Sequence, residues 1–204
     1  MKPLFLCYDT SRFQQAIDLA KSHSGAIIIF NPLDGPFGPK HHLDEWNEVI
    51  TKCSQAGAKS FGYINLLLPD NKTKPTTLLE TEILLWSNLH IDRIFFDNAR
   101  ATHAFLLTNL LRRHKSFTFL ANPGTFSPAL RKVPHLLLLE QEDNTESVKL
   151  LSSISIFFVR PERLSQVRAR AATSCKYAAF EPFSTYHKPN IEYQQPLPSD
   201  YLKF

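Results

Sequence analysis

The stretch RIFFDN (93–98) shows the pattern that decides the fold: a short apolar run that ends in a carboxylate and an amide. The pattern recurs along the chain at steps of roughly 20 to 35 residues. The other runs are PLFLCYD (3–9), AIIIFNP (26–32), SFGYIN (60–65), FTFLANPG (117–124), HLLLLEQED (135–143), SIFFVRP (155–161) and YAAFEPF (177–183). Because nearly continuous apolar strands suit a sheet that is buried on both faces, we predict eight buried parallel strands.

Helical segments are expected after each of the first four strands. Apolar residues recur there at three- or four-residue steps, which is the stripe of a helix packed against a sheet. The stripes are Phe13, Ile17 and Ala20; Leu43, Trp46, Ile50 and Cys53; Leu79, Ile83 and Trp86; and Leu107, Leu110 and Leu111. Thr10 or Ser11 is the expected cap of the first helix, and a helix of barely two turns is expected at 127–133.

Alternating strands and helices predict an α/β protein, and we expect a small single-domain (β/α)8 TIM-like barrel with short helices over residues 1–183. An extended C-terminal tail (184–204) is expected to pack on or beside this barrel. The chain has 204 residues, fewer than the about 250 that are typical of such barrels. The alternative is a half-open or doubly wound sheet, which favours a glycine-rich turn after an early strand; neither GxGxxG nor GxxxxGKS/T occurs here.

Composition narrows the possible partners. The net charge is +4, and basic residues cluster only locally without interleaved aromatics, so nucleic acid is not an expected partner. The three cysteines are widely spaced, and no spacing typical of metal ligands occurs. We therefore expect no metal and no cofactor. No apolar run is long enough to span a membrane. The N-terminus lacks the apolar core of a signal peptide, which predicts a cytoplasmic protein, or an exported one if a leader has been removed.

The strand ends supply the candidate site residues, because barrels of this kind place their chemistry at the C-terminal ends of the strands. These ends are Asp9, Asn31, Asn65, Asp97, Asn122, Glu140, Arg160 and Glu181. Asp97 follows three apolar residues and Glu140 follows four, and desolvation at such a rim makes a general acid possible near neutral pH. They lie on the fourth and sixth strands, so both side chains can point into one mouth. Two such carboxylates are what glycoside hydrolysis requires.

Simpler roles compete with these. Asp97 alone could cap the helix expected near Arg100. Asn122 and Asn31 can bind an incoming hydroxyl or amide, or can form Asx turns before a proline. Tyr8 and Tyr63 lie near strand ends and either stack against a sugar ring or pack in the core. Trp46 and Trp86 lie on helix stripes, so both are expected to be core residues.

Five motifs follow one another in this order: NPLDGPFG (31–38), AGAKSFGYIN (56–65), IDRIFFDN (91–98), LANPGT (120–125) and LLLLEQ with its following glutamate (136–142). This order resembles that of the spherulin-4-like family (spherulation-specific family 4) over roughly residues 3–143. The resemblance implies a barrel fold and hydrolysis of α-1,4-linked galactosamine or N-acetylgalactosamine polymers. It implies catalytic roles for Asp97 and Glu140, and substrate binding by Asn122, Asn31 and Tyr63; further candidate contacts are Tyr8, Asn98, Glu142 and Glu181.

The chain departs from the family pattern at two places in these motifs. The family's FFDE strand end is FFDN here, so Asn98 stands where the family keeps a second carboxylate, and Phe37 is inserted in the GPFG loop. Three hypotheses are open. The first is a hydrolase that acts on an α-linked amino-sugar glycan, acetylated or neutral rather than fully deacetylated. The second is a non-catalytic carbohydrate-binding barrel that has lost its chemistry. A barrel enzyme for a phosphorylated metabolite ranks last, because no glycine-rich loop follows the last two strands.

Overall fold

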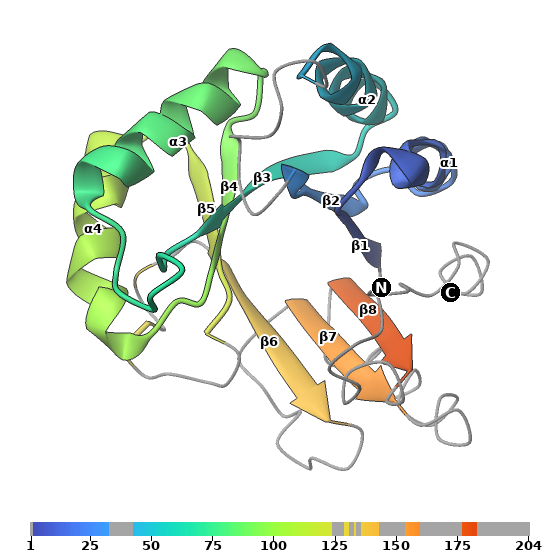
Figure 1. Cartoon of the computed structure of the whole chain (residues 1–204). Helices are drawn as coiled ribbons and strands as arrows, with labels where there is room; N and C mark the ends of the chain where they lie inside the picture. The colour runs from blue at the N-terminus through green and yellow to red at the C-terminus, as the bar shows by residue number, and fades with distance from the viewer. Residues whose placement is uncertain are drawn as a thin grey trace.

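The computed structural model describes residues 2–32, 43–123, 129–130 and 133, and the backbone of three further strands between 136 and 182. Eight parallel strands pair in sequence order, and the last pairs with the first, so the sheet closes into a barrel (Figure 1). They are β1 (Lys2–Cys7), β2 (Ile27–Phe30), β3 (Lys59–Asn65), β4 (Arg93–Asp97), β5 (Thr118–Ala121), β6 (Leu136–Glu142), β7 (Ile154–Val159) and β8 (Tyr177–Pro182). Each overlaps the apolar run that predicted it.

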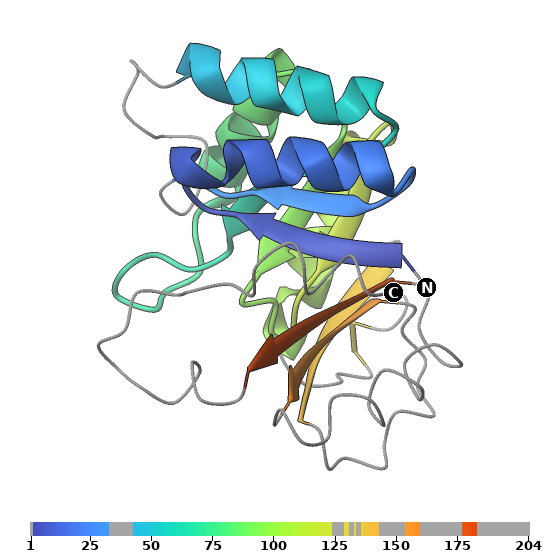
Figure 2. The ribbon, with the colours of Figure 1, turned by 90° about the vertical axis from the view of Figure 1, so that its right-hand side faces the viewer.

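A helix follows each of the first four strands. These are α1 (Phe13–Ser22), α2 (Leu43–Gln55), α3 (Thr76–Asn88) and α4 (Ala104–Arg113), with short 3-10 helices η1 (Thr10–Arg12) and η4 (Ala101–His103) ahead of α1 and α4. Figure 2 shows α1 and α2 side by side along the outer face of β1 and β2. Most of the segment 127–133 and all of the tail 184–204 lie outside the described residues.

The prediction that Thr10 or Ser11 caps the first helix is wrong by one or two residues, because the capping side chain is that of Asp9. The Asp9 carboxylate accepts a hydrogen bond from the Ser11 amide at 2.9 Å and pairs with the Arg12 guanidinium at 3.3 Å. It therefore caps η1, which leads directly into α1 at Phe13. A short acceptor side chain just before the first turn suits this position as well as a hydroxyl does. Asp9 thus has a structural role, although it too ends an apolar run.

The strand registers give the barrel its geometry. When the registers are extended past the last paired residues of β1, β2 and β5, a row of partners runs from Lys2 around the sheet and returns to β1 eight residues further along, level with Thr10. The row passes through Tyr177, Ile154, Leu138, Asn122, Asp97 and Asn65. A shear of eight for eight strands is the value that characterises (β/α)8 barrels. A line drawn around the barrel at constant height therefore shifts by one residue, relative to this row, at each successive strand. The residues on such a line are called a level below.

Apolar side chains fill the barrel and the space beneath its helices. Trp46 and Trp86 are 4% and 0% exposed, which confirms the prediction that both are core residues. Cys7 and Cys53 are buried free thiols; burial raises the pKa of the Cys53 thiol to about 12 and that of Cys7 further still. Among the described residues no helix is long and apolar enough to cross a membrane.

Candidate functional site

Asp97, the last residue of β4, is the centre of the polar cluster at the strand ends. The Tyr63 hydroxyl donates to its Oδ2 at 2.7 Å, and the Asn122 amide donates to its Oδ1 at 2.9 Å. Both donors are buried, at 6% exposure each, whereas Asp97 itself is half-buried. The cluster thus joins three neighbouring strands, β3, β4 and β5. Among the described residues, no hydrogen bond to the Asp97 side chain comes from a helix, and the residue that caps η4 is Arg100 rather than Asp97.

Backbone contacts hold the two donors in place. The backbone N–H of Asn122 donates to the Phe96 carbonyl at 2.8 Å, which extends the pairing of β5 with β4 by one residue. The indole of Trp86 on α3 donates to the Tyr63 carbonyl at 3.0 Å, and the Tyr63 ring lies 5.6 Å from the Phe95 ring. The ring of Tyr63 is therefore part of the core, which is one of the two roles expected for it. Its hydroxyl group binds the Asp97 carboxylate.

The register places Asp97 on one level of the barrel with three other predicted residues. With an offset of one residue per strand, this level passes through position 31 after β2, position 140 on β6 and position 181 on β8. Layers in (β/α)8 barrels are built from four residues on alternate strands. Asn31, Asp97, Glu140 and Glu181 are thus the residues of one such layer by backbone position. Asn31 is 3% exposed, and its side-chain oxygen has no partner within the described part of the chain.

The remaining predicted residues lie around this level. Tyr8 follows β1 and is half-buried against the core. Glu142 is the last residue of β6. Tyr63 and Asn122 lie one residue deeper in the barrel than the Asp97 level, and Asn65 lies one residue further out. Within the described residues no three His, Cys, Asp or Glu side chains are grouped as a metal site would need.

Asn98 and Asn65 form a second polar pair above Asp97. The Asn65 Oδ1 accepts a hydrogen bond from the Leu67 backbone at 2.9 Å and another from the Asn98 amide at 3.1 Å. Asn98 has a φ of 55° and is exposed. Asparagine tolerates this left-handed conformation better than most residues do. At position 98 the chain therefore turns sharply at the end of β4, and the side chain is directed toward β3 rather than toward Asp97.

The connection between β3 and α3 borders the cluster and is held by two side chains that the sequence patterns did not single out. It begins with the Leu66 amide donating to the Asp97 carbonyl at 3.1 Å. His103 in η4 is 2% exposed; its Nδ1 accepts from the Arg100 amide at 3.0 Å, so its Nε2 carries the proton toward the Thr73 hydroxyl at 2.9 Å. Burial, with the nearby Arg100 charge, lowers the pKa of His103.

Glu82 is the second of these side chains. It lies in the apolar stripe of α3, is 2% exposed and accepts a hydrogen bond from the Lys74 ammonium at 2.7 Å. Burial raises the pKa of its carboxyl, although Lys74 acts in the opposite direction. A carboxylate within an otherwise apolar helix stripe, LLETEILLW (78–86), was the available signal for a buried ion pair.

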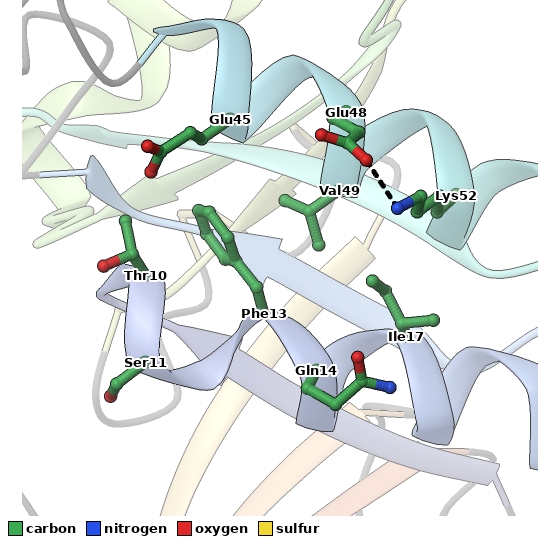
Figure 3. Close-up of a pocket in the computed structure, with 9 residues that line it drawn as sticks. All are labelled: Thr10, Ser11, Phe13, Gln14, Ile17, Glu45, Glu48, Val49 and Lys52. Carbon is green, nitrogen blue, oxygen red and sulfur yellow. Dashed lines mark hydrogen bonds and ion pairs between the residues drawn. The ribbon is translucent and has the colours of Figure 1, made fainter.

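A groove of about 380 Å³ lies between α1 and α2 on the outer surface (Figure 3). Phe13, Ile17 and Val49 line it with apolar surface, and Glu48 and Lys52 form an ion pair at its side. None of the predicted site residues lines this groove. It is a gap between two packed helices, and the strand-end cluster around Asp97 is the better candidate site.

Comparison with known proteins identifies the fold. No protein-family model and no curated protein matches the chain. Among solved structures, an O-GlcNAc hydrolase from Thermobaculum terrenum matches with a TM-score of 0.58 at 12% identity, over 89% of this chain and 54% of that one. The YdjI aldolase from Escherichia coli K12 matches with a TM-score of 0.57 at 11% identity, over 87% of this chain and 74% of that one.

The tryptophan synthase α-subunit from Pyrococcus furiosus matches with a TM-score of 0.53 at 12% identity, over 88% of this chain and 86% of that one. The chain has a TIM-barrel-like fold. At these identities the likeness concerns the fold alone. The chain spans about half the length of the hydrolase that it matches.

Proposed function

We propose that the chain is a glycoside hydrolase-like protein that cleaves an α-linked amino-sugar glycan, of the N-acetylgalactosamine or galactosamine type, with two carboxylates on a complete (β/α)8 barrel. The resemblance to the spherulin-4-like family supports this proposal, and so does the fold likeness to an O-GlcNAc hydrolase. The observation that carries it is the Asp97 carboxylate. Two buried donors hold this carboxylate. Asp97 lies on the level of the barrel that also holds the backbone of Glu140.

The two carboxylates take different roles in this proposal. Each oxygen of Asp97 accepts a hydrogen bond from a neutral donor, an arrangement that fixes the orientation of the carboxylate. Asp97 then serves as the base or nucleophile on the anomeric side. Glu140 donates its proton to the glycosidic oxygen as that bond to the anomeric carbon breaks, and a water molecule supplies the new hydroxyl. Asn122 orients Asp97 and the substrate.

Mutation of each carboxylate tests the proposal. Purified wild type, Asp97→Asn and Glu140→Gln are assayed on α-1,4-linked N-acetylgalactosamine and galactosamine oligosaccharides. Loss of one of two catalytic carboxyls is expected to lower kcat by at least about a hundredfold. Asp92→Asn is the matched control, because Asp92 precedes the same strand and is exposed. An inactive wild type, or full rates in both variants, contradicts the assignment.

A non-catalytic carbohydrate-binding barrel is the second candidate, and Asn98 favours it because the resembling family has a carboxylate at that position. Calorimetry separates the two. Binding of an oligosaccharide by wild type without turnover supports the second candidate, and release of reducing ends supports the first.

A further inference from the structure

The amide pair above Asp97 has one fixed arrangement of donors and acceptors. The Leu67 backbone N–H can donate only to an oxygen, so it identifies the Asn65 atom that faces it as Oδ1. Asn98 must then direct its Nδ2 to the same oxygen. This leaves the Asn65 Nδ2 and the Asn98 Oδ1 without partners in the described part of the chain. The pair therefore presents one neutral donor group and one neutral acceptor.

The pair also lies on the outer side of Asp97. Asn65 and Asp97 are register partners on β3 and β4, and Asn65 lies one residue further out than the Asp97 level. Tyr63 and Asn122 approach Asp97 from one residue deeper in the barrel. A sugar that approached Asp97 from the C-terminal ends of the strands would therefore bring a ring substituent against Asn65 and Asn98.

We propose that Asn65 and Asn98 form a subsite that selects an acetamido substituent over an ammonium on the sugar bound at Asp97. This rests on the proposed function. An acetamido group has one acceptor, its carbonyl, and one donor, its N–H, and these match the Asn65 Nδ2 and the Asn98 Oδ1. An ammonium group has donors only, so it gains one hydrogen bond and faces the Asn65 N–H groups with like polarity. In this interpretation the amide at position 98 determines the substrate and is no remnant of a lost acid.

Asn65→Asp is the sharpest test. An aspartate retains the oxygen that accepts from Leu67 and Asn98, and it replaces the open Nδ2 with a second carboxylate oxygen. The fold is thereby kept while the subsite becomes anionic. Asn88→Asp makes the same change at an exposed position at the end of α3 and serves as the control.

The readout is the ratio of kcat/KM for N-acetylgalactosamine oligosaccharides to that for fully de-N-acetylated ones of the same length. Wild type and Asn88→Asp should favour the acetylated substrate. In Asn65→Asp the ratio should fall by about tenfold or more, because a charge-assisted hydrogen bond to the ammonium replaces a neutral one to the acetamide. An unchanged ratio in Asn65→Asp, or a wild type that favours the de-N-acetylated substrate, overturns the inference.

Failure of the proposed function is recognised separately. If the wild type cleaves neither substrate, the hydrolase assignment fails, and the ratio of the two dissociation constants from calorimetry replaces the kinetic ratio. The same tenfold change in Asn65→Asp then supports the subsite. Absence of the change, or of any binding by the wild type, overturns it.

Discussion

Replacing Lys74 with methionine should destabilise the protein strongly at neutral pH and only weakly in acid. Lys74 lies at the end of the β3–α3 connection, and its ammonium is the partner of Glu82 inside the apolar stripe of α3. Methionine retains most of the aliphatic length of lysine and removes its charge. The Glu82 carboxylate is then left in the core without its cation.

The size of the effect follows from the burial of the pair. The two side chains are 10% and 2% exposed, and the second Glu82 oxygen has no hydrogen-bond partner among the described residues. Breaking a buried pair by removing one partner typically costs about 3–5 kcal/mol. Because the pair has a single close contact and the lysine retains some access to water, we expect about 3 kcal/mol at pH 7.

The pH dependence has a definite sign. Burial raises the pKa of Glu82 above its ordinary value of 4.5, so the folded state holds this proton more tightly than the unfolded state does. The contribution of Glu82 to the free energy of unfolding is therefore greatest below pH 4.5 and falls as the pH rises through the raised pKa. Without Lys74 the pKa rises further and the fall becomes larger. At pH 4, where Glu82 is mostly protonated, the variant should lose only about 1 kcal/mol, through altered packing.

Urea denaturation at pH 4 and pH 7 measures both values. The double variant Lys74→Met/Glu82→Met is the control, because an apolar pair of similar volume often replaces a buried ion pair without loss. It should recover most of the stability at pH 7. Equal losses for the single variant at both pH values, or a double variant as unstable as the single one, would refute the reasoning.

Three further predictions concern His103 in η4 and two residues of β3, Gly62 and Tyr63. Because the pKa of His103 is lowered, the thermal midpoint of the wild type should fall as the pH drops below 6.5, and His103→Gln should remove this slope; a slope that persists in the variant contradicts it. In Gly62→Ala the new Cβ would lie 2.3 Å from the fully buried Trp86 indole, so urea denaturation should show a loss of about 2 kcal/mol, and a neutral result would mean that the indole can move. Tyr63→Phe removes one donor to the half-exposed Asp97, so unfolding should show a loss of about 1 kcal/mol. If the hydrolase proposal holds, Tyr63→Phe should also lower kcat about tenfold with little change in KM. An unchanged kcat would show that the Tyr63 hydroxyl does not position Asp97 for catalysis.

The strands and first helices could be predicted because each depends on a local pattern. Apolar runs bounded by polar residues mark the eight strands, and three- and four-residue periodicity marks α1 to α4. The start of the first helix could not be assigned in this way. Thr10, Ser11 and Asp9 are all good caps by residue type, and the choice among them depends on the turn by which the chain leaves β1.

The contacts of the candidate site are beyond local patterns. The hydrogen bonds from Tyr63 and Asn122 to Asp97 join residues that are 34 and 25 positions apart, and they depend on the register of β3, β4 and β5. Sequence reasoning selected all three residues but gave Tyr63 a choice between stacking and core packing. Its ring packs in the core and its hydroxyl binds the carboxylate. Only the position of the ring relative to β4 resolves that choice.

The barrel shear explains why strand ends that look alike in the sequence lie at different depths in the barrel. With one residue of offset per strand, the ends of the even strands, Asn31, Asp97, Glu140 and Glu181, fall on one level by backbone position. The ends of odd strands fall elsewhere: Asn122 is one residue deeper than this level, and Asn65 is one residue further out.

This division gives each set a different task. The level of the even strands holds the backbone of both proposed catalytic residues, whereas the odd strands supply amides and a hydroxyl just below and just above it. A neutral group below Asp97 can orient its carboxylate, and a neutral group above it can meet the substrate. Asn98 follows the even strand β4, but its side chain donates to Asn65 and so joins the outer groups. In the proposed function, an amide at position 98 therefore changes the groups that would meet the sugar and leaves both proposed catalytic residues unchanged.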